Sequence, residues 1–436
     1  MDPIKHIVVL MMENHSFDQM LGFLGLTNPD VDGVNQSRFN IDPRDNSKVF
    51  QLPITTMVNQ NDPLHEYTDA LEHMKNNNGH FVSNYAGKYP TSTKNETQEV
   101  MGYYEDGAFP ALHDLAKNFV VCDKWFSSLP GPTWPNRFFV HSGTSLGHVD
   151  MPSGLFDPGW HLYDQTTIYD LFEEANISWK IYFDGTPQSL LMTHQLAYGG
   201  HYHRFIEDFE KDCTKPESEF PSYVFIEPDY SGATQNDQHP PSNLMNGDRL
   251  IAKVYNAIRA NDALWNSTLF VVIYDEDGGF YDHVTPPKTV APDQNTDDFK
   301  FNILGFRIPA ILVSPHLTKG TDHTIYDHTS ILKYACQKWG LNPSRLGARV
   351  PYSNSIGHLF NTNAPTRFDV PAQVWVGQEF LHATRPMPAD SHESSLIAFN
   401  HFMTDGRGIS TEELLDVNAS YDLAYEETLK LLKIVV

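Results

Sequence analysis

Four runs of apolar and β-branched residues recur along the chain, at residues 4–12, 223–226, 269–274 and 308–314. Continuous runs of this kind are typical of strands that are buried on both faces of a parallel sheet. Helical spacing of apolar side chains occurs between them, at residues 168–175, 247–259 and 329–339. Because strand and helix alternate, we expect an α/β fold: a three-layer sandwich with helices on both faces of a mostly parallel central sheet.

The pattern changes near residue 361. Beyond this point the apolar runs shorten, residues 410–413 have the spacing of a helix capping box, and residues 427–436 have the pattern of an amphipathic helix. No internal repeat, low-complexity run or Gly/Ser linker divides the preceding sequence. We therefore expect a main domain over residues 1–360 and a C-terminal accessory region over residues 361–436.

The composition excludes one class of partner. The 436 residues include 55 Asp and Glu against 30 Lys and Arg, which gives a formal charge of -25. Binding to nucleic acid through general electrostatics needs clustered Lys and Arg, so we expect no nucleic-acid partner. Since 40% of the residues are hydrophobic, a large packed core is expected. The 21 His are unusual in such a chain, because histidine is both an acid/base group near neutral pH and a metal ligand.

Signals for membranes and export are missing from the pattern. No stretch approaches the roughly 18 consecutive apolar residues of a transmembrane segment. The apolar run at residues 7–12 ends at Glu13 without a basic start, unlike a classical signal peptide. We therefore expect a protein that stays in the cytoplasm or leaves through a signal-peptide-independent secretion system. The three cysteines, Cys122, Cys213 and Cys336, lack CxxC spacing and are expected to be buried and reduced.

Acidic residues follow two of the predicted strands, at the edge where open α/β sheets bind ligands. The first run leads into Glu13 and Asn14, and the third into Asp275, Glu276 and Asp277. Three consecutive carboxylates beside an apolar strand repel one another unless a cation or protons compensate them. An oxygen-ligated metal ion explains both segments, whereas the alternatives are a helix cap after the first run and a solvated acidic turn after the third.

A proline-rich segment follows at residues 127–137. Three prolines and a glycine surround Thr133, which predicts a rigid loop that presents one hydroxyl group, with Asn136 and Arg137 nearby to bind an anion. A hydroxyl is a poor nucleophile at neutral pH unless a base or a metal ion activates it. Without the acidic segments, a plain proline-rich turn is the simpler interpretation.

Three histidines lie in polar segments beside Asp or Asn: His65, His239 and His328. Each one alone is more often a solvated loop residue than a catalytic group, but together with a metal site they meet the needs of phosphoryl chemistry. Asp282 and His283 follow the acidic run closely enough to orient its side chains or to act as acid/base partners.

Three motifs together resemble the non-specific phospholipase C and acid phosphatase family of phosphoesterases, within the alkaline-phosphatase-like superfamily. They are Met12 to Asp18, Pro130 to Arg137 and Tyr274 to His283. The resemblance spans roughly residues 4–339, and Thr rather than Ser at position 133 favours the phospholipase C branch. His15, Trp134 and Asp277 depart from the residues common in the family, which affects head-group binding and local charge.

The resemblance implies roles for individual residues. It implies that Glu13, Asn14, Asp275 and Glu276 bind a divalent metal ion and that Thr133 is the nucleophile. His65, His239 and His328 would line the site with it, and we expect Asn136, Arg137, Asp282 and His283 to contact the substrate. The oxygen-rich ligand set favours Ca²⁺ or Mn²⁺, while the superfamily resemblance favours Zn²⁺, which we expect.

The expected activity is that of a metal-dependent phospholipase C, with residues 1–360 as its catalytic domain. It would hydrolyse glycerophospholipids such as phosphatidylcholine to diacylglycerol and a phosphorylated head group. Thr133 would form a phosphothreonine, and His328 or His239 would protonate the leaving oxygen. The alternatives are an acid phosphatase acting on soluble phosphomonoesters and a non-catalytic lipid- or protein-binding module.

Contact with the lipid surface is expected to be peripheral. Aromatic and apolar residues close to the motifs can anchor at an interface without positive charge, so zwitterionic lipids would be the better substrates. They are Phe23, Leu24, Trp125, Phe126, Trp134, Phe138 and Phe139. The alternative is that these side chains are core, which we favour for Phe138 and Phe139. The sequence assigns no oligomeric state.

Overall fold

The computed structural model describes residues 2–151, 163–296, 299–360, 365–381 and 432. In this part of the chain the main sheet consists of β1 (His6–Met12), β6 (Val120–Cys122), β7 (Trp179–Phe183), β8 (Tyr202–Arg204), β9 (Tyr223–Glu227), β10 (Thr268–Tyr274), β11 (Ala310–Val313) and β12 (Gly320–Asp322). The strands follow the order β12-β6-β11-β10-β1-β9-β7-β8. The apolar strands β1, β9 and β10 lie in the middle of this sheet, as the hydrophobic pattern predicts.

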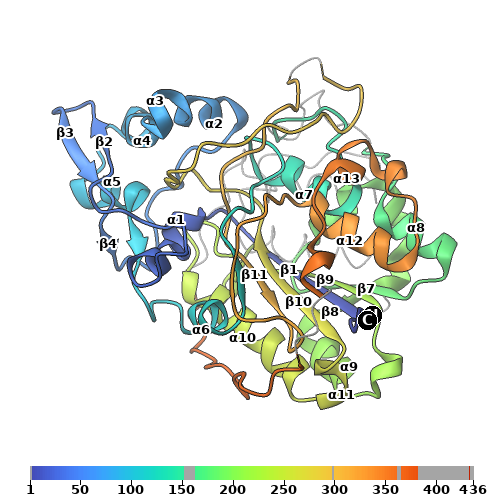
Figure 1. Cartoon of the computed structure of the whole chain (residues 1–436). Coiled ribbons are helices and arrows are strands. Elements are labelled where there is room, and N and C mark those ends of the chain that lie inside the picture. The colour runs from blue at the N-terminus through green and yellow to red at the C-terminus, as the bar shows by residue number, and fades with distance from the viewer. Residues whose placement is uncertain (1, 152–162, 297–298, 361–364, 382–431, 433–436) are drawn as a thin grey trace.

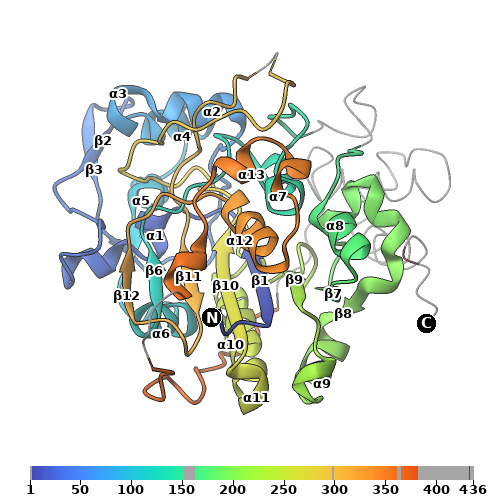
Figure 2. The same cartoon turned by 45° about the vertical axis from the view of Figure 1, so that its right-hand side comes forward.

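Helices cover both faces of the sheet (Figures 1 and 2). One face carries α6 (Pro110–Asn118) and α10 (Leu244–Arg259), with the short α9 (Glu210–Cys213) and α11 (Asp262–Trp265) beside α10. The other face carries α7 (Thr133–Ser142), α8 (Ile168–Ala175), α12 (Thr329–Trp339) and α13 (Arg349–Tyr352). The predicted three-layer α/β fold is therefore confirmed.

One predicted strand direction is wrong. The run at residues 308–314 forms β11, which pairs antiparallel to β10, with Phe270 opposite Val313 and Ile273 opposite Ala310. A parallel neighbour needs a crossover connection, usually a helix, and the described residues between β10 and β11 contain none. A fully buried strand is continuously apolar in either direction, so the hydrophobic pattern does not distinguish the two.

A smaller lobe lies beside the sheet, on the left of Figure 1. It contains α2 (Tyr67–His73), α3 (Lys75–Asn78), α4 (Phe81–Lys88), α5 (Lys94–Met101) and the hairpin of β2 (Phe39–Asp42) and β3 (Ser47–Phe50). Phe81, Tyr85 and Val100 from this lobe pack with Tyr281 and Phe306 in a small core of their own. The segment that enters α2 carries Asp62 and His65 toward the ends of β1 and β10.

Short elements complete the fold. They are α1 (Phe17–Met20), the two-residue strands β4 (Pro53–Ile54) and β5 (Tyr103–Tyr104), the π-helix η4 (Phe205–Phe209), and the 3-10 helices η1 (Gly22–Leu26), η2 (Gln188–Leu191), η3 (Thr193–His201), η5 (Glu217–Glu219), η6 (Pro343–Leu346) and η7 (Ile356–Phe360). The shortest strands of the main sheet, β6, β8 and β12, have three residues each, too few for a periodic signal in the sequence.

The first part of the predicted accessory region, residues 365–381, packs along α10. The amide side chain of Asn256 exchanges two hydrogen bonds with the backbone of Val374, at 2.8 and 2.9 Å. Asn246 does the same with Phe380, at 2.8 Å for both bonds. The predicted capping box at residues 410–413 lies outside the described residues, as does the predicted helix at residues 427–436 apart from the buried Leu432. The boundary near residue 361 stays a prediction.

The aromatic residues expected at a membrane surface are in the core. Phe23, Trp125, Phe126, Trp134 and their neighbours are all buried, with exposed fractions of at most 8%. This excludes them as interfacial anchors and confirms the alternative for Phe138 and Phe139. No helix among the described residues is long and apolar enough to cross a membrane. The three cysteines are buried and unpaired, as expected.

Candidate active site

Thr133 is the first residue of α7, where a loop was expected. Pro132 is the N-cap, and Pro135 is tolerated in the first turn because backbone N–H groups there have no partner within the helix. The Thr133 hydroxyl is buried and donates to Asn14 Oδ1 at 3.4 Å. The positive end of the dipole of this ten-residue helix favours negative charge at the hydroxyl.

The ends of β1 and β10 bring the acidic segments together. The two strands pair in parallel up to Met12 and Tyr274, so the residues that follow them lie side by side. The backbone N–H of Asn14 donates to Asp275 Oδ1 at 3.0 Å. Asn14 has a left-handed φ of 59°, a conformation that Asn adopts more readily than most residues. Gly278 is required beside it, because a Cβ at this position would lie 2.1 Å from the Asn14 carbonyl oxygen.

Arg137 joins two of the predicted metal ligands. Its Nη2 lies 3.1 Å from Glu13 Oε1 and its Nε lies 3.1 Å from Asp275 Oδ2. Its Nη1 donates to the Tyr230 hydroxyl at 2.8 Å. The guanidinium group is only 2% exposed and uses its nitrogens on these partners. These contacts hold the carboxylates of Glu13 and Asp275 in place, and the role of Arg137 in binding the substrate's phosphate stays a prediction.

Asn136 has a similar structural role. Its Nδ2 donates to the Gly131 carbonyl at 2.9 Å, and its Oδ1 accepts from the Leu129 N–H at 3.1 Å. The side chain is buried and fixes the segment that leads into α7. These contacts do not support the prediction that Asn136 binds substrate.

Glu276 lies in the middle of the acidic segment. Its carboxylate is fully buried, and Oε2 accepts from the Gly278 N–H at 2.6 Å. Burial raises the pKa of Glu276 well above its usual range, His65 lowers it, and Asp277 and Asp275 raise it further. Oε1 has no hydrogen-bond partner among the described residues.

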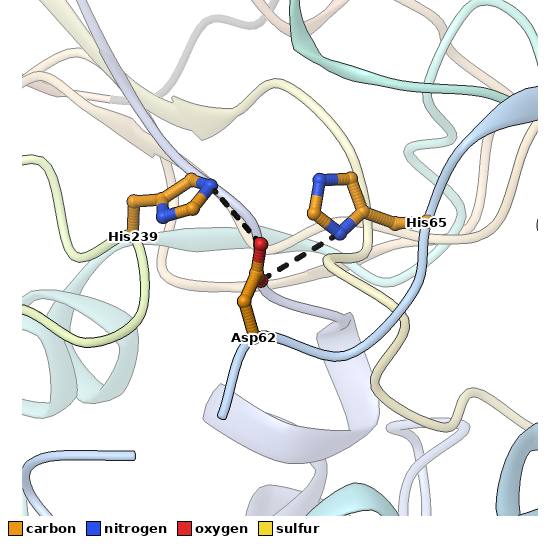
Figure 3. A group of neighbouring side chains, drawn as sticks. All are labelled: Asp62, His65 and His239. Carbon is orange, nitrogen blue, oxygen red and sulfur yellow. Dashed lines mark ion pairs between the residues drawn. The ribbon is translucent and has the colours of Figure 1, made fainter. Parts of the chain in front are cut away.

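Asp62 stands between His65 and His239 (Figure 3). Its Oδ1 lies 3.7 Å from His65 Nδ1, and its Oδ2 lies 3.8 Å from His239 Nε2. His65 Nε2 points the other way, 3.2 Å from Asn14 Nδ2 and 3.9 Å from Glu276 Oε1. Burial lowers the pKa of His65, but the carboxylates of Glu276 and Asp62 raise it more, to about 9. The acidic segment at residues 275–277 therefore lies next to the group formed by Asp62, His65 and His239.

His328 precedes α12 and is fully buried. Its Nε2 lies 2.7 Å from the backbone carbonyl of Asp275, so this nitrogen must carry the proton and donate it. Burial lowers the pKa of His328 to about 4, which leaves Nδ1 with a lone pair that has no hydrogen-bond partner among the described residues.

Asp282 and His283 lie in a different cluster. Arg307 Nε donates to Asp282 Oδ1 at 2.9 Å, and Arg307 Nη2 donates to Asp18 Oδ1 at 2.8 Å. His283 Nδ1 lies 2.8 Å from Asp18 Oδ2, and its Nε2 lies 2.9 Å from Asp32 Oδ1. We call Asp18, Asp282, His283 and Arg307 the Arg307 cluster. Its members are paired with one another, which does not support the prediction that Asp282 and His283 contact substrate.

Several residues of the site were missed by sequence reasoning. Gln188, in η2, donates to Glu13 Oε1 at 2.8 Å, and Glu227 accepts the backbone N–H groups of Gln188 and Ser189 at 2.7 and 3.1 Å. Glu227 ends β9, so the rule that identified Glu13 and Asp275 applies to it as well. Gln188 and Asp62 have no comparable signal, because each reaches the site from a segment without periodicity.

The buried charges fit a divalent cation. The carboxylates of Glu13, Asp275, Glu276 and Asp277 are at most 3% exposed, and the cations beside them are Arg137 and His65. Burial raises the pKa of Asp275, of Glu276 and, to about 7, of Asp277, as expected for carboxylates in excess. Among the described residues, two groups bring carboxylate and imidazole donor atoms within 4.8 Å of one another: Asp62, His65 and His239, and Asp18, Asp282 and His283. The structure thus contains candidate metal-binding groups.

Comparisons with known proteins identify the family of this chain. A family model described as the Phosphoesterase family matches residues 4–342. Non-specific phospholipase C6 of Arabidopsis thaliana is 34% identical over 394 residues, which covers 85% of this chain and 74% of the plant protein. Phospholipase C B of Mycobacterium tuberculosis is 29% identical and covers 83% of this chain and 78% of its own length.

Similarity to solved structures is weaker. A protein of the alkaline phosphatase superfamily from Vibrio parahaemolyticus aligns with 56% of this chain and 63% of its own, at a TM-score of 0.33 and 13% identity, too low to bear on function. The family match over most of the sequence and the relatives above 30% identity carry the assignment. This chain belongs to the Phosphoesterase family and, within it, groups with enzymes named non-specific phospholipase C.

Proposed function

We propose that this enzyme is a metal-dependent phospholipase C that hydrolyses glycerophospholipids such as phosphatidylcholine to diacylglycerol and a phosphorylated head group. The observation that carries the proposal is the Thr133 hydroxyl at the start of α7, hydrogen-bonded to Asn14 beside a group of buried carboxylates. This hydroxyl therefore lies between the electropositive N-terminal end of α7 and the buried carboxylates that we propose as metal ligands. The names of the relatives support a phospholipase activity.

The first step is attack of Thr133 Oγ1 on phosphorus. A P–O bond forms to Thr133 as its hydroxyl proton passes to the surrounding water, and the P–O bond to diacylglycerol breaks, which leaves a phosphothreonine that carries the head group. Glu13, Asn14, Asp275 and Glu276 would hold the metal ion, which supplies charge neutralisation and lowers the pKa of the attacking hydroxyl. Arg137 keeps Glu13 and Asp275 in position.

The leaving oxygen needs a proton, and His239 is the better donor. His239 is 8% exposed, and Asp62 lies 3.8 Å from its Nε2, where it stabilises the protonated imidazole. His328 is fully buried, and its one proton is donated to the Asp275 carbonyl. In the second step His239 takes a proton from the water that attacks phosphorus, the bond to Thr133 breaks, and the Thr133 oxygen regains a proton from the surrounding water as the phosphorylated alcohol is released.

The decisive experiment is hydrolysis of phosphatidylcholine vesicles by Thr133→Ala and Asp275→Asn. We expect each variant to lose about 10³-fold or more in kcat/KM, because each removes a group that acts on the reacting phosphorus or on the metal ion. Thr133→Ser is the matched control and should keep measurable activity. Wild-type rates in Thr133→Ala would refute the phosphothreonine mechanism. A wild-type enzyme that prefers nitrophenyl phosphate to phosphatidylcholine would instead be an acid phosphatase.

The metal ion is proposed to be Zn²⁺, with Ca²⁺ or Mn²⁺ as the alternatives. Elemental analysis of the purified protein, followed by chelation and rescue with each ion, distinguishes the three. Rescue by Ca²⁺ alone would exclude zinc.

We also propose that contact with the lipid surface is peripheral and that zwitterionic lipids are preferred. The formal charge of -25 repels anionic surfaces. Rates on vesicles of phosphatidylcholine and of phosphatidylserine test this, and faster hydrolysis of phosphatidylserine would contradict it.

A further inference from the structure

A cavity of about 250 Å³ lies beyond the ends of β7, β8 and β9. Asp184 follows β7, Arg204 ends β8, Asp229 follows β9, and α10 closes the cavity with Arg249 and Lys253. These strands run parallel to one another and to β1, so the cavity opens at the same edge of the sheet as the active site. This is the edge where open α/β sheets bind ligands.

Three cations converge on this cavity in a chain that is poor in them. Only 30 of the 436 residues are Lys or Arg, yet Arg204, Arg249 and Lys253 all line it. Arg249 and Lys253 are four residues apart on α10, so their side chains share one face of the helix, where like charges repel. An anion bound between the two side chains would relieve this repulsion, which Glu379 offsets in part by pairing with Arg249.

Among the described residues, carboxylates that line the cavity form ion pairs with two of its three cations. Arg249 Nη1 lies 2.6 Å from Glu379 Oε1, and Arg204 Nη2 lies 3.7 Å from Asp184 Oδ1. Lys253 forms no ion pair with the described part of the chain, and burial together with Arg249 lowers its pKa. The cavity thus offers one ammonium group that forms no ion pair with the described residues, next to two guanidinium groups, although the carboxylates of Glu379 and Asp184 attract it at longer range.

We infer that this cavity is a second binding site, separate from the active site, for a small anion that carries a phosphate group. Lys253, Arg249 and Arg204 supply the charge-assisted donors that phosphate oxygens accept. The acidic wall at Asp184 and Asp229, with the buried ring of Phe205, leaves room for a cationic group on the same molecule. The phosphate comes either from inorganic phosphate or from a phosphorylated head group.

The cavity and the active site share a loop. Asp229 lines the cavity, while the next residue, Tyr230, accepts a hydrogen bond from Arg137 at 2.8 Å. Asn236, from the same loop, accepts from the Asp229 N–H at 2.8 Å, and His239 follows three residues later. The two sites are therefore neighbours that use different side chains, and substitutions can separate them.

The test is calorimetric titration of the full chain with inorganic phosphate. We expect the wild type to bind phosphate at two sites. Glu276→Gln should lose phosphate binding at the active site. Lys253→Met should weaken phosphate binding at the cavity about tenfold or more, since it removes a charge-assisted hydrogen bond. Lys253→Arg keeps the charge and should retain binding. Arg259→Met, on the same helix but outside the cavity, is the matched control and should bind as the wild type does. Wild-type binding in Lys253→Met would overturn the proposal.

Two further measurements complete the test. If Lys253→Met melts at a lower temperature, Arg249→Gln replaces it as the reporter, with the same expected loss. Titration with phosphocholine, and with choline as a control, distinguishes the sources: tighter binding of phosphocholine than of phosphate indicates a head-group site, and equal affinity indicates a phosphate site. If the active site binds no phosphate, a single site remains, and Lys253→Met should remove it. Absence of phosphate binding in the wild type would refute the inference.

Discussion

Two buried clusters of charged side chains lie on the same two segments of the chain, those that follow β1 and β10. The clusters differ in how their charges are balanced. Glu13 and Asn14 follow β1, and Asp275 and Glu276 follow β10; we call these four the active-site cluster. A few residues further along the same segments, Asp18, Asp282 and His283 meet Arg307 in the Arg307 cluster. Each cluster is almost completely removed from water.

The Arg307 cluster is complete without a ligand. Arg307 donates to both carboxylates and to two backbone carbonyls, and His283 pairs with Asp18. Burial raises the pKa of Asp18, but His283 and Arg307 lower it more, to about 2, so the carboxylate is held ionised. The cluster links the segments that follow β1 and β10 to the segment that leads into β11.

The active-site cluster has carboxylates in excess. Arg137 pairs with Glu13 and Asp275, whereas His65 is the cation that the described residues place beside Glu276 and Asp277, and burial raises the pKa of both of these carboxyl groups. A buried charge that the protein leaves uncompensated marks a place where a ligand or a reaction supplies the compensation. The two clusters are therefore both largely buried but differ in charge balance, which is the basis for the predictions below.

The largest expected difference is in activity. Glu276→Gln should lower kcat/KM on phosphatidylcholine about 10³-fold, because it removes a proposed metal ligand. Asp282→Asn, the matched change in the Arg307 cluster, should leave kcat/KM of the folded protein within about threefold of the wild type. Steady-state kinetics on folded protein, checked by circular dichroism, measure both. An equal loss in Asp282→Asn would mean that the two clusters form one catalytic unit.

The second expected difference is in stability. Arg307→Met should lower the free energy of unfolding by about 3–5 kcal/mol, since it leaves two buried carboxylates without their cation. Arg345→Met is the control, because Arg345 pairs with Glu174 at the surface and such pairs contribute about 0–1 kcal/mol. Urea unfolding of both variants gives the comparison. Similar values for the two would show that the Arg307 cluster does not stabilise the fold.

The third expectation concerns pH. Burial lowers the pKa of His283, but Asp18 raises it more, to about 9, above the ordinary 6.5. Its contribution, on the order of 3 kcal/mol, is therefore fully present below pH 6.5 and is lost as pH rises through about 9. Urea unfolding between pH 6 and pH 9.5 should show this decline in the wild type and a flatter profile in His283→Gln. Parallel profiles would assign the decline to other groups.

The smallest expected effect is that of the metal ion on stability. A divalent ion at about 100 times its Kd should stabilise the fold by about 2.7 kcal/mol, because it binds the folded protein and not the unfolded chain. Thermal unfolding with and without chelator measures this. The shift should shrink in Glu276→Gln and stay the same in Asp282→Asn. A chelator effect that Asp282→Asn abolishes would move the metal ion to the Arg307 cluster.

Much of the site was predictable because it follows strand ends. Glu13, Asn14, Asp275 and Glu276 come directly after apolar runs, and parallel strands place such residues at one edge. The prolines around Thr133 identified it as a candidate residue, although the segment forms the first turn of a helix and not a loop. The contacts of Arg137 with Glu13 and Asp275 were not predicted, since these partners come from distant parts of the chain.

Other features could not be predicted from patterns in the sequence. The direction of β11 depends on the path of the chain between two strands, and the burial of Trp125 and Trp134 depends on which helices cover the sheet. Gln188 and Asp62 reach the site from aperiodic segments, so neither spacing nor hydrophobicity identifies them. The cavity at Lys253 combines residues from strands, a helix and the segment around Glu379.

Hydrophobic periodicity and strand-end position are local properties of the chain, so they predicted the α/β class, the buried central strands and the chemical groups that follow them. The tertiary structure alone decided which charges meet. Asp18 and Glu13 are five residues apart, yet one is neutralised by Arg307 and the other lies in the active-site cluster. Pairing of buried charges depends on distances of a few ångströms between remote segments, and only the folded chain brings these together.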